Sequence, residues 1–598
     1  MNSFPKLTET AIRQRASDTS FERGYDYYKK KTVLIVIRRG NQLFAEVEGS
    51  SYKPYQVSVT MSEHGIEDAN CTCPYDWAGD CKHIVAVLLV YIHSSEAVKE
   101  HPSVETLLAD LDRDQLQTLI LRLVERQPNL TNVIQSQLSV MQTLVVGGTS
   151  DPEVTSPLEC RIPLDQTPFR HQVRAALHSL DYMRPFEAYW AVGNVVDDLR
   201  GILGQARTFV EAGDGRNASV ILEAITEEYM DRWEFLDDSE GESSGFFNEL
   251  GSLWIEAILL VDLTPAEREE WGDRLEDWQA VLDGYGFDDV FSAAREAAIQ
   301  SWDYPPLQRV LRGVITDLGA WEGEAPRYAD DLAVARLNIL ARQGRTQEYL
   351  YLAEAEGQTK HYVTMLVQLG HIREAVNYGL DHLTLVDEAL TLAQALHARG
   401  ELELALHVAE HGLKLRGEHS ALARWIRDVA TTADQPERAL NATIIAVREA
   451  PNLTDYQAAQ TLAGERWPEL REKLLAHLQK TKSRYPEAHV NIFLYEGRVD
   501  DAIAALGDFT HYTLLEKVAD AAISTRPDWV IRVCCQQAEH IMNAGKSEKY
   551  HHAVNWLKKA RAAYLAVDRQ AEWEKYLADL LVRHKRRYKL VPMLRELQ

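Results

Sequence analysis

Three cysteines and one histidine occupy a single short stretch of the chain, between residues 71 and 83. Cys71 and Cys73 are separated by one residue, seven residues follow, and Cys81 and His83 are again separated by one residue. Three thiolates and one imidazole fill the tetrahedral shell of a zinc ion and leave no open position, which is typical of a structural site. Soft sulfur ligands favour zinc over magnesium or calcium. The stretch therefore predicts one structural zinc ion held by these four side chains.

The residues around these ligands fit a loop that closes on a metal. Pro74 and Gly79 lie between the two ligand pairs, and both residue types are typical of a chain that turns. The apolar run from Ile84 to Ile92 predicts a buried helix, whose first turn would supply Cys81 and His83. Because half of the six cysteines of the chain fall in this one stretch, chance is a poor explanation for the cluster.

The pattern C-x-C-x7-C-x-H, within CTCPYDWAGDCKHIVAVLL, resembles the SWIM zinc finger. The preceding residues also resemble that family, at Ser20–Gly24, Tyr27-Tyr28, Gly49-Ser50 and Pro54-Tyr55. The resemblance covers about residues 15 to 95, and the helical remainder is more loosely similar to bacterial SWIM proteins of unassigned role. It implies a zinc-stabilised module that binds DNA or proteins, in a family whose members include parts of helicases and transposases.

The distribution of charge limits where nucleic acid could bind. The net charge of −26 disfavours a protein that coats nucleic acid with its whole surface. Residues 1–95 contain 11 Lys or Arg and 11 Asp or Glu, so the entire excess of negative charge lies after residue 95. Contacts with phosphate are therefore expected from the amino-terminal module or from the basic carboxyl end.

Five cations are expected to lie near one turn of the amino-terminal module: Lys29, Lys30, Lys31, Arg38 and Arg39. They could contact the phosphates of DNA or RNA, or they could be the solvated ends of a helix and a hairpin. Four tyrosines of the module could stack on bases or belong to its core: Tyr27, Tyr28, Tyr52 and Tyr55. The basic run 583–589 could bind nucleic acid or an acidic partner, or it could lie beside a helix that caps the chain.

The order of the sequence patterns predicts a mainly α-helical protein with a small α+β module at its amino end. Two short helices are expected over 7–30, three or four antiparallel strands over 32–70, and helices over 104–141. The chain is divided into a SWIM-like zinc module (1–95), a helical extension (96–145), a linker (146–168), a helical domain (169–324) and a degenerate helical-repeat array (325–598).

A repeated turn signature identifies the array. Four glycines are each followed, five positions later, by a small or aromatic residue and then by an aliphatic one: Gly344, Gly370, Gly400 and Gly497. Asp434 begins a weaker copy. A glycine that closes one helix, followed by a helix with alanine at its crossing point, resembles tetratricopeptide-type repeats. Such arrays form a solenoid whose concave face binds partners, so a protein partner is expected there.

The sequence contains no arrangement of residues typical of a catalytic site, so we expect a non-enzymatic protein. Gly545-Lys546-Ser547 lacks the first glycine of a phosphate-binding loop, His407 and His411 lack a third ligand, and Cys534-Cys535 reads as buried thiols. The start of the chain lacks the apolar core of a signal peptide, and no apolar run approaches the roughly 20 residues that span a bilayer. Since the cysteines suggest no disulfide framework, a reducing cytoplasm is the simplest setting and no membrane partner is expected.

Two functions are compatible with these patterns. In the first, the zinc module and the helical repeats bind nucleic acid, a protein complex or both. In the second, the chain is a protein-only scaffold and the zinc site is purely structural. An enzyme on an unrecognised helical fold is a third and less favoured alternative. The first two differ in electrostatics, because binding to phosphates weakens steeply as the salt concentration rises.

Overall fold

The computed structural model of the chain describes residues 7–49, 54–62, 65–73, 75, 79–94, 97–102, 104–109, 111–126, 130–147, 163–179, 185–232, 242–284, 286–481, 486–507 and 512–598. Most of the predicted linker, 146–168, lies outside these ranges. The chain separates into two compact units, Met1–Tyr304 with Pro326–Arg342, and Pro305–Ala325 with Gln343–Gln598. Within the described ranges, no helix combines the length and apolarity that crossing a membrane requires.

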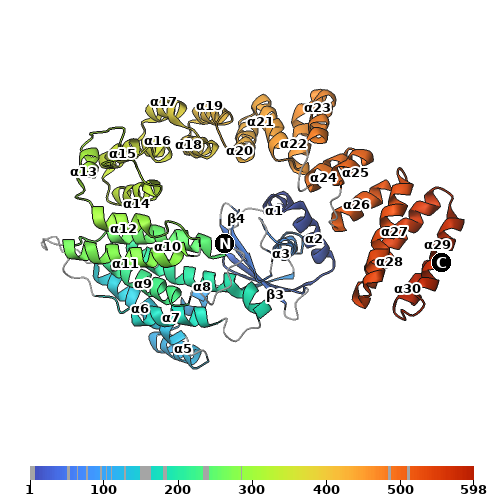
Figure 1. Cartoon of the computed structure of the whole chain (residues 1–598), viewed down its shortest axis with the longest axis horizontal. Helices are drawn as coiled ribbons and strands as arrows, with labels where there is room; N and C mark the ends of the chain where they lie inside the picture. The colour runs from blue at the N-terminus through green and yellow to red at the C-terminus, as the bar shows by residue number, and fades with distance from the viewer. Residues whose placement is uncertain are drawn as a thin grey trace. The chain divides into compact units, whose positions relative to one another are not determined.

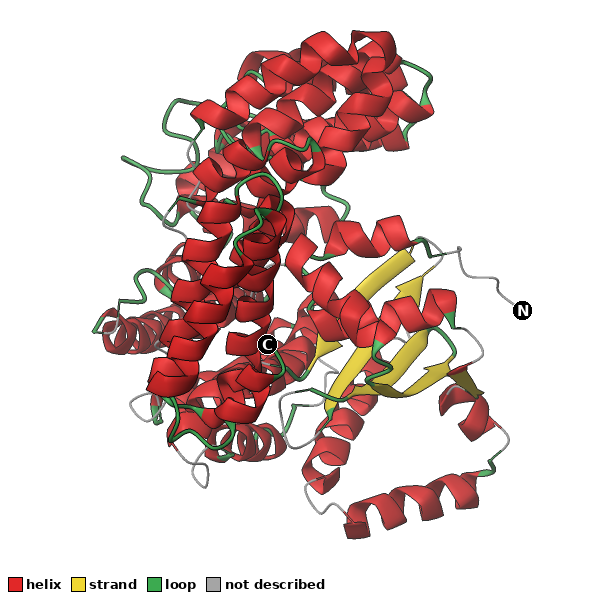
Figure 2. Ribbon diagram, turned by 90° about the vertical axis from the view of Figure 1, so that its right-hand side faces the viewer, coloured by secondary structure: helices red, strands yellow, loops and turns green. Residues whose placement is uncertain are grey.

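A five-stranded sheet forms the centre of the amino-terminal module (Figure 2). The strands are β1 (Val33–Arg39), β2 (Gln42–Val47), β3 (Tyr55–Ser62), β4 (Gly65–Cys71) and β5 (Val98–His101), in the order β4-β3-β2-β1-β5. The first four strands pair antiparallel, which confirms the predicted sheet. The fifth was not predicted: β5 pairs parallel to β1, so the sheet extends past residue 95.

Three helices complete this module on one side of the sheet. α1 (Glu9–Arg15) and α2 (Asp18–Lys29) begin after Thr8 and Ser17, whose hydroxyls accept hydrogen bonds from backbone N–H groups of the first turn. α3 (Lys82–His93) contacts strands β1 to β4 and packs against α1 and α2. Since side chains of a strand alternate between its faces, every second residue of β2 lies in the core under α3.

The rest of the first unit is helical, as the sequence predicted. α4 (Val104–Ala109), α5 (Arg113–Arg126) and α6 (Leu130–Gly147) follow the sheet. Then come α7 (Thr167–His178), α8 (Pro185–Glu211), α9 (Gly215–Met230), α10 (Glu242–Leu259), α11 (Pro265–Asp283), α12 (Ser292–Gln300) and α14 (Ala329–Arg342). Trp254 is fully buried between helices, with its ring centroid 5.1 Å from that of Trp271 and 5.6 Å from that of Trp278.

The second unit is a succession of helices (Figure 1, yellow to red). They are α13 (Pro305–Leu311), α15 (Thr346–Ala355), α16 (Thr359–Leu369), α17 (Ile372–His382), α18 (Val386–Ala398), α19 (Leu402–Gly412), α20 (Ser420–Thr432), α21 (Pro436–Glu449), α22 (Leu453–Ala463), α23 (Trp467–Lys480), α24 (Glu487–Tyr495), α25 (Val499–Leu506), α26 (Tyr512–Ala522), α27 (Pro527–Ala544), α28 (Tyr550–Ala566), α29 (Gln570–Arg583) and α30 (Leu590–Arg595). Helices pack against the next helix and often the next but one, as in α16–α18, α17–α19, α22–α24 and α24–α26. This packing is typical of a helical solenoid.

The turn signature of the array corresponds to one backbone conformation. The five signature residues all have positive φ, from 54° at Asp434 to 84° at Gly370 and Gly400. Each lies between two helices, where a left-handed residue ends the first helix. The alanines five positions later are fully buried, as the repeat predicted: Ala375, Ala405, Ala439 and Ala502. Two further copies were not predicted from the sequence. They begin at Gly357 and at Asp568, and both residues also have positive φ.

Candidate metal centre

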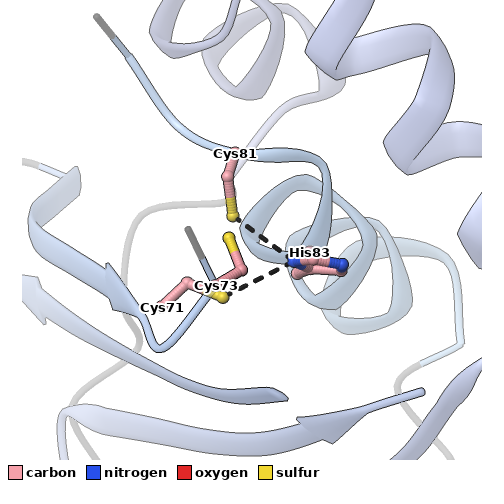
Figure 3. Close-up of side chains that lie close together, drawn as sticks. All are labelled: Cys71, Cys73, Cys81 and His83. Carbon is pink, nitrogen blue, oxygen red and sulfur yellow. Dashed lines mark hydrogen bonds between the residues drawn. The ribbon is translucent and has the colours of Figure 1, made fainter. Parts of the chain in front are cut away.

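The four predicted ligands come from both ends of one loop. Cys71 is the last residue of β4, and Cys73 follows it in the loop. Cys81 immediately precedes α3, and His83 lies in the first turn of that helix. Figure 3 shows the three sulfur atoms and the imidazole converging on one point. All four donor atoms lie within 4.8 Å of one another.

The spacing of these atoms fits a tetrahedral zinc ion. Zinc–sulfur bonds of about 2.3 Å and zinc–nitrogen bonds of about 2.0 Å place a thiolate and an imidazole nitrogen roughly 3.6 Å apart in a tetrahedral shell. Nδ1 of His83 lies 3.6 Å from Sγ of Cys71 and 3.9 Å from Sγ of Cys81. The residues are therefore positioned to hold one zinc ion. Among the described residues, no second group of three or more potential ligands is found.

The thiols of the site shift one another's pKa values. Hydrogen bonds with the thiols of Cys71 and Cys81 lower the pKa of Cys73, and the ammonium of Lys82 acts in the same direction. The contact with Cys73 raises the pKa of Cys71, and burial adds to that rise. Because zinc binds thiolates, filling the site must release protons, and zinc affinity must increase with pH.

A hydrogen-bonded contact with α1 fixes the second ligand pair. Gly79 has φ +90°, and a Cβ atom there would lie 2.6 Å from the carbonyl oxygen of Arg15. The N–H of Asp80 donates to that same oxygen over 2.7 Å, and Nε of Arg15 lies 2.9 Å from Oδ2 of Asp80. Burial raises the pKa of Asp80, and the Arg15 guanidinium opposes that rise. Glycine at position 79 therefore allows the close approach that holds Cys81 beside α1.

Two tyrosines hold the imidazole ligand in place. The ring of His83 is 2% exposed and stacks on Tyr55, with centroids 4.5 Å apart, while Tyr27 meets it edge-on at 5.3 Å. Tyr28 donates to or accepts from Ser94 over 3.2 Å. These tyrosines thus belong to the module's interior rather than to a stacking surface, whereas Tyr52 lies outside the described residues.

The structure does not bring the five predicted cations together. Lys29–Lys31 lie at the end of α2, whereas Arg38 and Arg39 lie at the far end of β1, and seven extended residues span roughly 20 Å. The expectation that all five lie near one turn is therefore corrected, because β1 lies between them. Nζ of Lys29 sits 4.5 Å from the ring centroid of Tyr25, and Arg38 pairs with Glu100 at 3.2 Å. The other three form no ion pair with a described residue.

The basic carboxyl end is partly occupied by contacts within the array. Arg583 pairs with Glu539 at 3.2 Å and with Asp579 at 2.8 Å. Arg587 donates to the hydroxyl of Tyr550 over 3.2 Å. The run therefore packs α29 and the turn after it against α27 and α28, and α30 is the short closing helix that the sequence predicted.

The adjacent cysteines of α27 are not a reactive pair. Burial raises the pKa of Cys534 to about 12 and that of Cys535 to about 11, so both are protonated thiols near neutral pH. A protonated, buried thiol is a poor nucleophile and a poor metal ligand.

The fold and the site define a zinc finger in which a strand and a helix supply the ligands. Residues 55–92 match the SWIM zinc finger family, so the chain carries a SWIM zinc finger. The chain is also 26% identical, over 346 residues, to the zinc finger SWIM domain-containing protein 8 homolog of Drosophila melanogaster. That match covers 47% of this chain and only 16% of the fly protein.

One solved structure, a circular tandem repeat protein with novel repeat topology and enhanced subunit contact surfaces, matches 77% of this chain and 98% of its own. The two are 16% identical, and the TM-score of 0.14 is too low for this match to bear on the fold.

Proposed function

We propose that the chain is a non-enzymatic binding protein in which the zinc module contacts nucleic acid and the helical array binds a protein partner. The observation that supports binding of nucleic acid is that several cations of the module are accessible and form no ion pair with a described residue. Lys30 and Lys31 are exposed, Arg39 is half-buried, and none of the three forms an ion pair with a described residue. Arginines of the array are often paired instead, as Arg424 and Arg427 are with Asp455. Unpaired cations on a neutral module are the natural contacts for phosphate.

The zinc ion supports this function without taking part in it. Four protein ligands leave no open position, so the metal holds β4 against α3 and does no chemistry. Thiolate ligands, together with the buried thiol of Cys534 and the half-buried thiol of Cys535, suit a reducing compartment, and the cytoplasm is the proposed setting.

The test is the salt dependence of binding to nucleic acid by the full chain. Because the cations form two groups, two variants are needed: one with Lys29, Lys30 and Lys31 replaced by Gln, and one with Arg38 and Arg39 replaced by Gln. Each lost phosphate contact should reduce the logarithmic salt slope by roughly 0.7 to 0.9. A matched control replaces Lys585, Arg586 and Lys589, which are exposed cations outside the module. If only the control variant changes the slope, the site lies at the carboxyl end.

A protein-only scaffold is the second candidate, and the net charge of −26 favours it. Under this alternative the unmodified protein binds neither DNA nor RNA at low salt. The variant Cys73→Ser separates the two readings further, because structural zinc contributes folding energy locally. It should unfold the module and abolish nucleic-acid binding, while the helical circular dichroism of the array and its capture of a protein partner persist.

A further inference from the structure

In the part of the chain that the structure describes, the face of the five-stranded sheet opposite α3 is open, with side chains that are exposed or half-buried. Residues of β2 alternate, so that Leu43, Ala45 and Val47 lie under α3 and Phe44 points to the opposite face. Phe44 is 39% exposed and makes no ring contact with a described aromatic residue. A phenylalanine held by a strand on both sides is a rigid platform, because its position is fixed by the ladder rather than by a loop.

The pairing of the strands places cationic and polar side chains around this ring. Phe44 lies opposite Ile37 of β1 and Ser58 of β3, and Ile37 in turn lies opposite Lys99 of β5. Neighbouring strands are about 4.8 Å apart, so Lys99 lies roughly 10 Å from the ring along this row.

The adjacent row on the same face is also polar. Arg39 lies opposite Gln42 of β2 and His101 of β5, and Gln42 lies opposite Thr60 of β3. Lys99 and His101 are exposed, and neither forms an ion pair with a described residue.

The charge of the face changes from one edge to the other. The β5–β1 side carries the cations Lys99 and Arg39 and the imidazole of His101, whereas the β4 side carries Asp68, and Glu46 lies in the row beyond Phe44. A negatively charged backbone is therefore favoured along β5 and β1 and disfavoured along β4. This asymmetry gives a bound strand one preferred position, with its phosphates at the cationic edge and a base reaching inward to the ring.

We propose that this open face is where the module binds single-stranded nucleic acid, with a base stacked on Phe44 and phosphates beside Lys99, Arg39 and His101. The inference rests on the proposed function and narrows it to a ligand class and a surface. Bases in a duplex are stacked on each other and cannot offer a face to a flat sheet, whereas unpaired bases can stack on an exposed aromatic ring. DNA and RNA share this chemistry.

The experiment measures binding of the full chain to fluorescent oligo(dT), oligo(U) and a DNA duplex of equal length at low salt. Phe44→Ala should weaken binding to the single strands by roughly 5- to 150-fold, because that is the range for loss of one base–aromatic stack. Phe44→Tyr keeps the ring and should retain affinity. The matched control is Leu34→Ala, which removes an apolar side chain that is 50% exposed on β1 at the irregularity in its pairing with β2.

Zinc content and thermal melting of each variant show whether the module is still folded. Single strands bound more tightly than duplex, with a loss in Phe44→Ala and none in Leu34→Ala, support the inference, and the two single strands show whether DNA or RNA is preferred. Equal binding by Phe44→Ala and the unmodified protein, or preference for the duplex, overturns the sheet face while the proposed function stands. A protein that binds none of the three probes overturns both.

Discussion

The imidazole of His83 lies against the phenol ring of Tyr55, with ring centroids 4.5 Å apart and planes inclined by 30°. This contact is possible because residue 49 is glycine. A Cβ atom on Gly49 would lie 2.4 Å from Cε2 of Tyr55 and 3.3 Å from Nε2 of His83. The strand that carries Tyr55 thus orients a zinc ligand on α3 without touching the metal.

Gly49→Ala should weaken zinc binding, because the tyrosine ring must move and the imidazole then loses its support. Residues that orient a metal ligand typically contribute 10- to 100-fold in affinity, so a decrease of about that size is expected. Competition with a chromophoric chelator measures it. Gly201→Ala on α8 is the control, since a Cβ atom there meets nothing within 4 Å. Unchanged zinc affinity in Gly49→Ala would show that the stack does not orient His83.

The left-handed turns of the array predict a pair of opposite effects. Asp434→Gly should raise the free energy of unfolding by about 0.5–1 kcal/mol, because glycine adopts φ near +54° at little cost. Gly400→Ala should lower it by about 1 kcal/mol. A Cβ atom at Gly400 meets nothing within 4 Å, so this change isolates backbone strain. Urea unfolding followed by circular dichroism measures both, and effects of the same sign would contradict the explanation.

A buried histidine in α24 predicts acid sensitivity of the array. His489 is 4% exposed, and neither ring nitrogen has a partner among the described residues. Burial, followed by the charge of His477, lowers its pKa below the ordinary value. Below about pH 6.5 the unfolded chain binds a proton that the folded chain excludes. The free energy of unfolding is therefore unaffected by His489 above that pH, and it decreases as the pH falls below it.

The variant His489→Leu should make the free energy of unfolding less dependent on pH, because unfolding then takes up as much as one proton fewer per molecule. The free energy of unfolding at neutral pH should stay the same or rise. Urea unfolding between neutral and mildly acid pH gives the slope. His382→Leu is the control because the side chain of His382 is exposed. Burial also lowers the pKa of His361 and His584, so part of the slope should remain. A variant with the full slope of the unmodified protein would exclude His489 as its source.

The fifth strand predicts where the module can be cut. A fragment that ends at residue 95 lacks β5 and leaves residues 36–39 of β1, which include Val36 and Ile37, without a strand partner on that edge. Exposed apolar edges pair with other chains, so this fragment should aggregate. A fragment that ends at residue 102 keeps the edge covered and should remain monomeric with one zinc. Light scattering and metal analysis compare the two, and equal behaviour would mean that β5 does not protect the edge.

The parts of this protein that were predictable are those whose signal is local. The four ligands lie within one loop, so their spacing alone defines a tetrahedral site. The repeat turns were found because a left-handed residue, followed five positions later by a small or aromatic residue, recurs in each copy. Asp568 was missed because its copy has Asp for Gly and Glu574 where the signature has an aliphatic residue.

Features that depend on distant contacts were not predicted. The four residues of β5 have no alternating pattern, and only their pairing with β1, more than 50 positions earlier, makes them a strand. The separation of the two groups of cations was not predicted, because a run of charged residues does not indicate the distance that the strand between them spans. The stack of Tyr55 on His83 joins β3 to α3, and no spacing in the sequence indicates it.

The parallel pairing of β5 with β1 also sets an order in time. During synthesis on a ribosome, every zinc ligand emerges before the strand that covers the edge of β1, since His83 precedes Val98. The metal can therefore join β4 to α3 before β5 has been synthesised and while the edge of β1 is still unpaired. The growing chain therefore passes through a stage in which zinc is already bound but the edge of β1 can still pair with a strand of another chain.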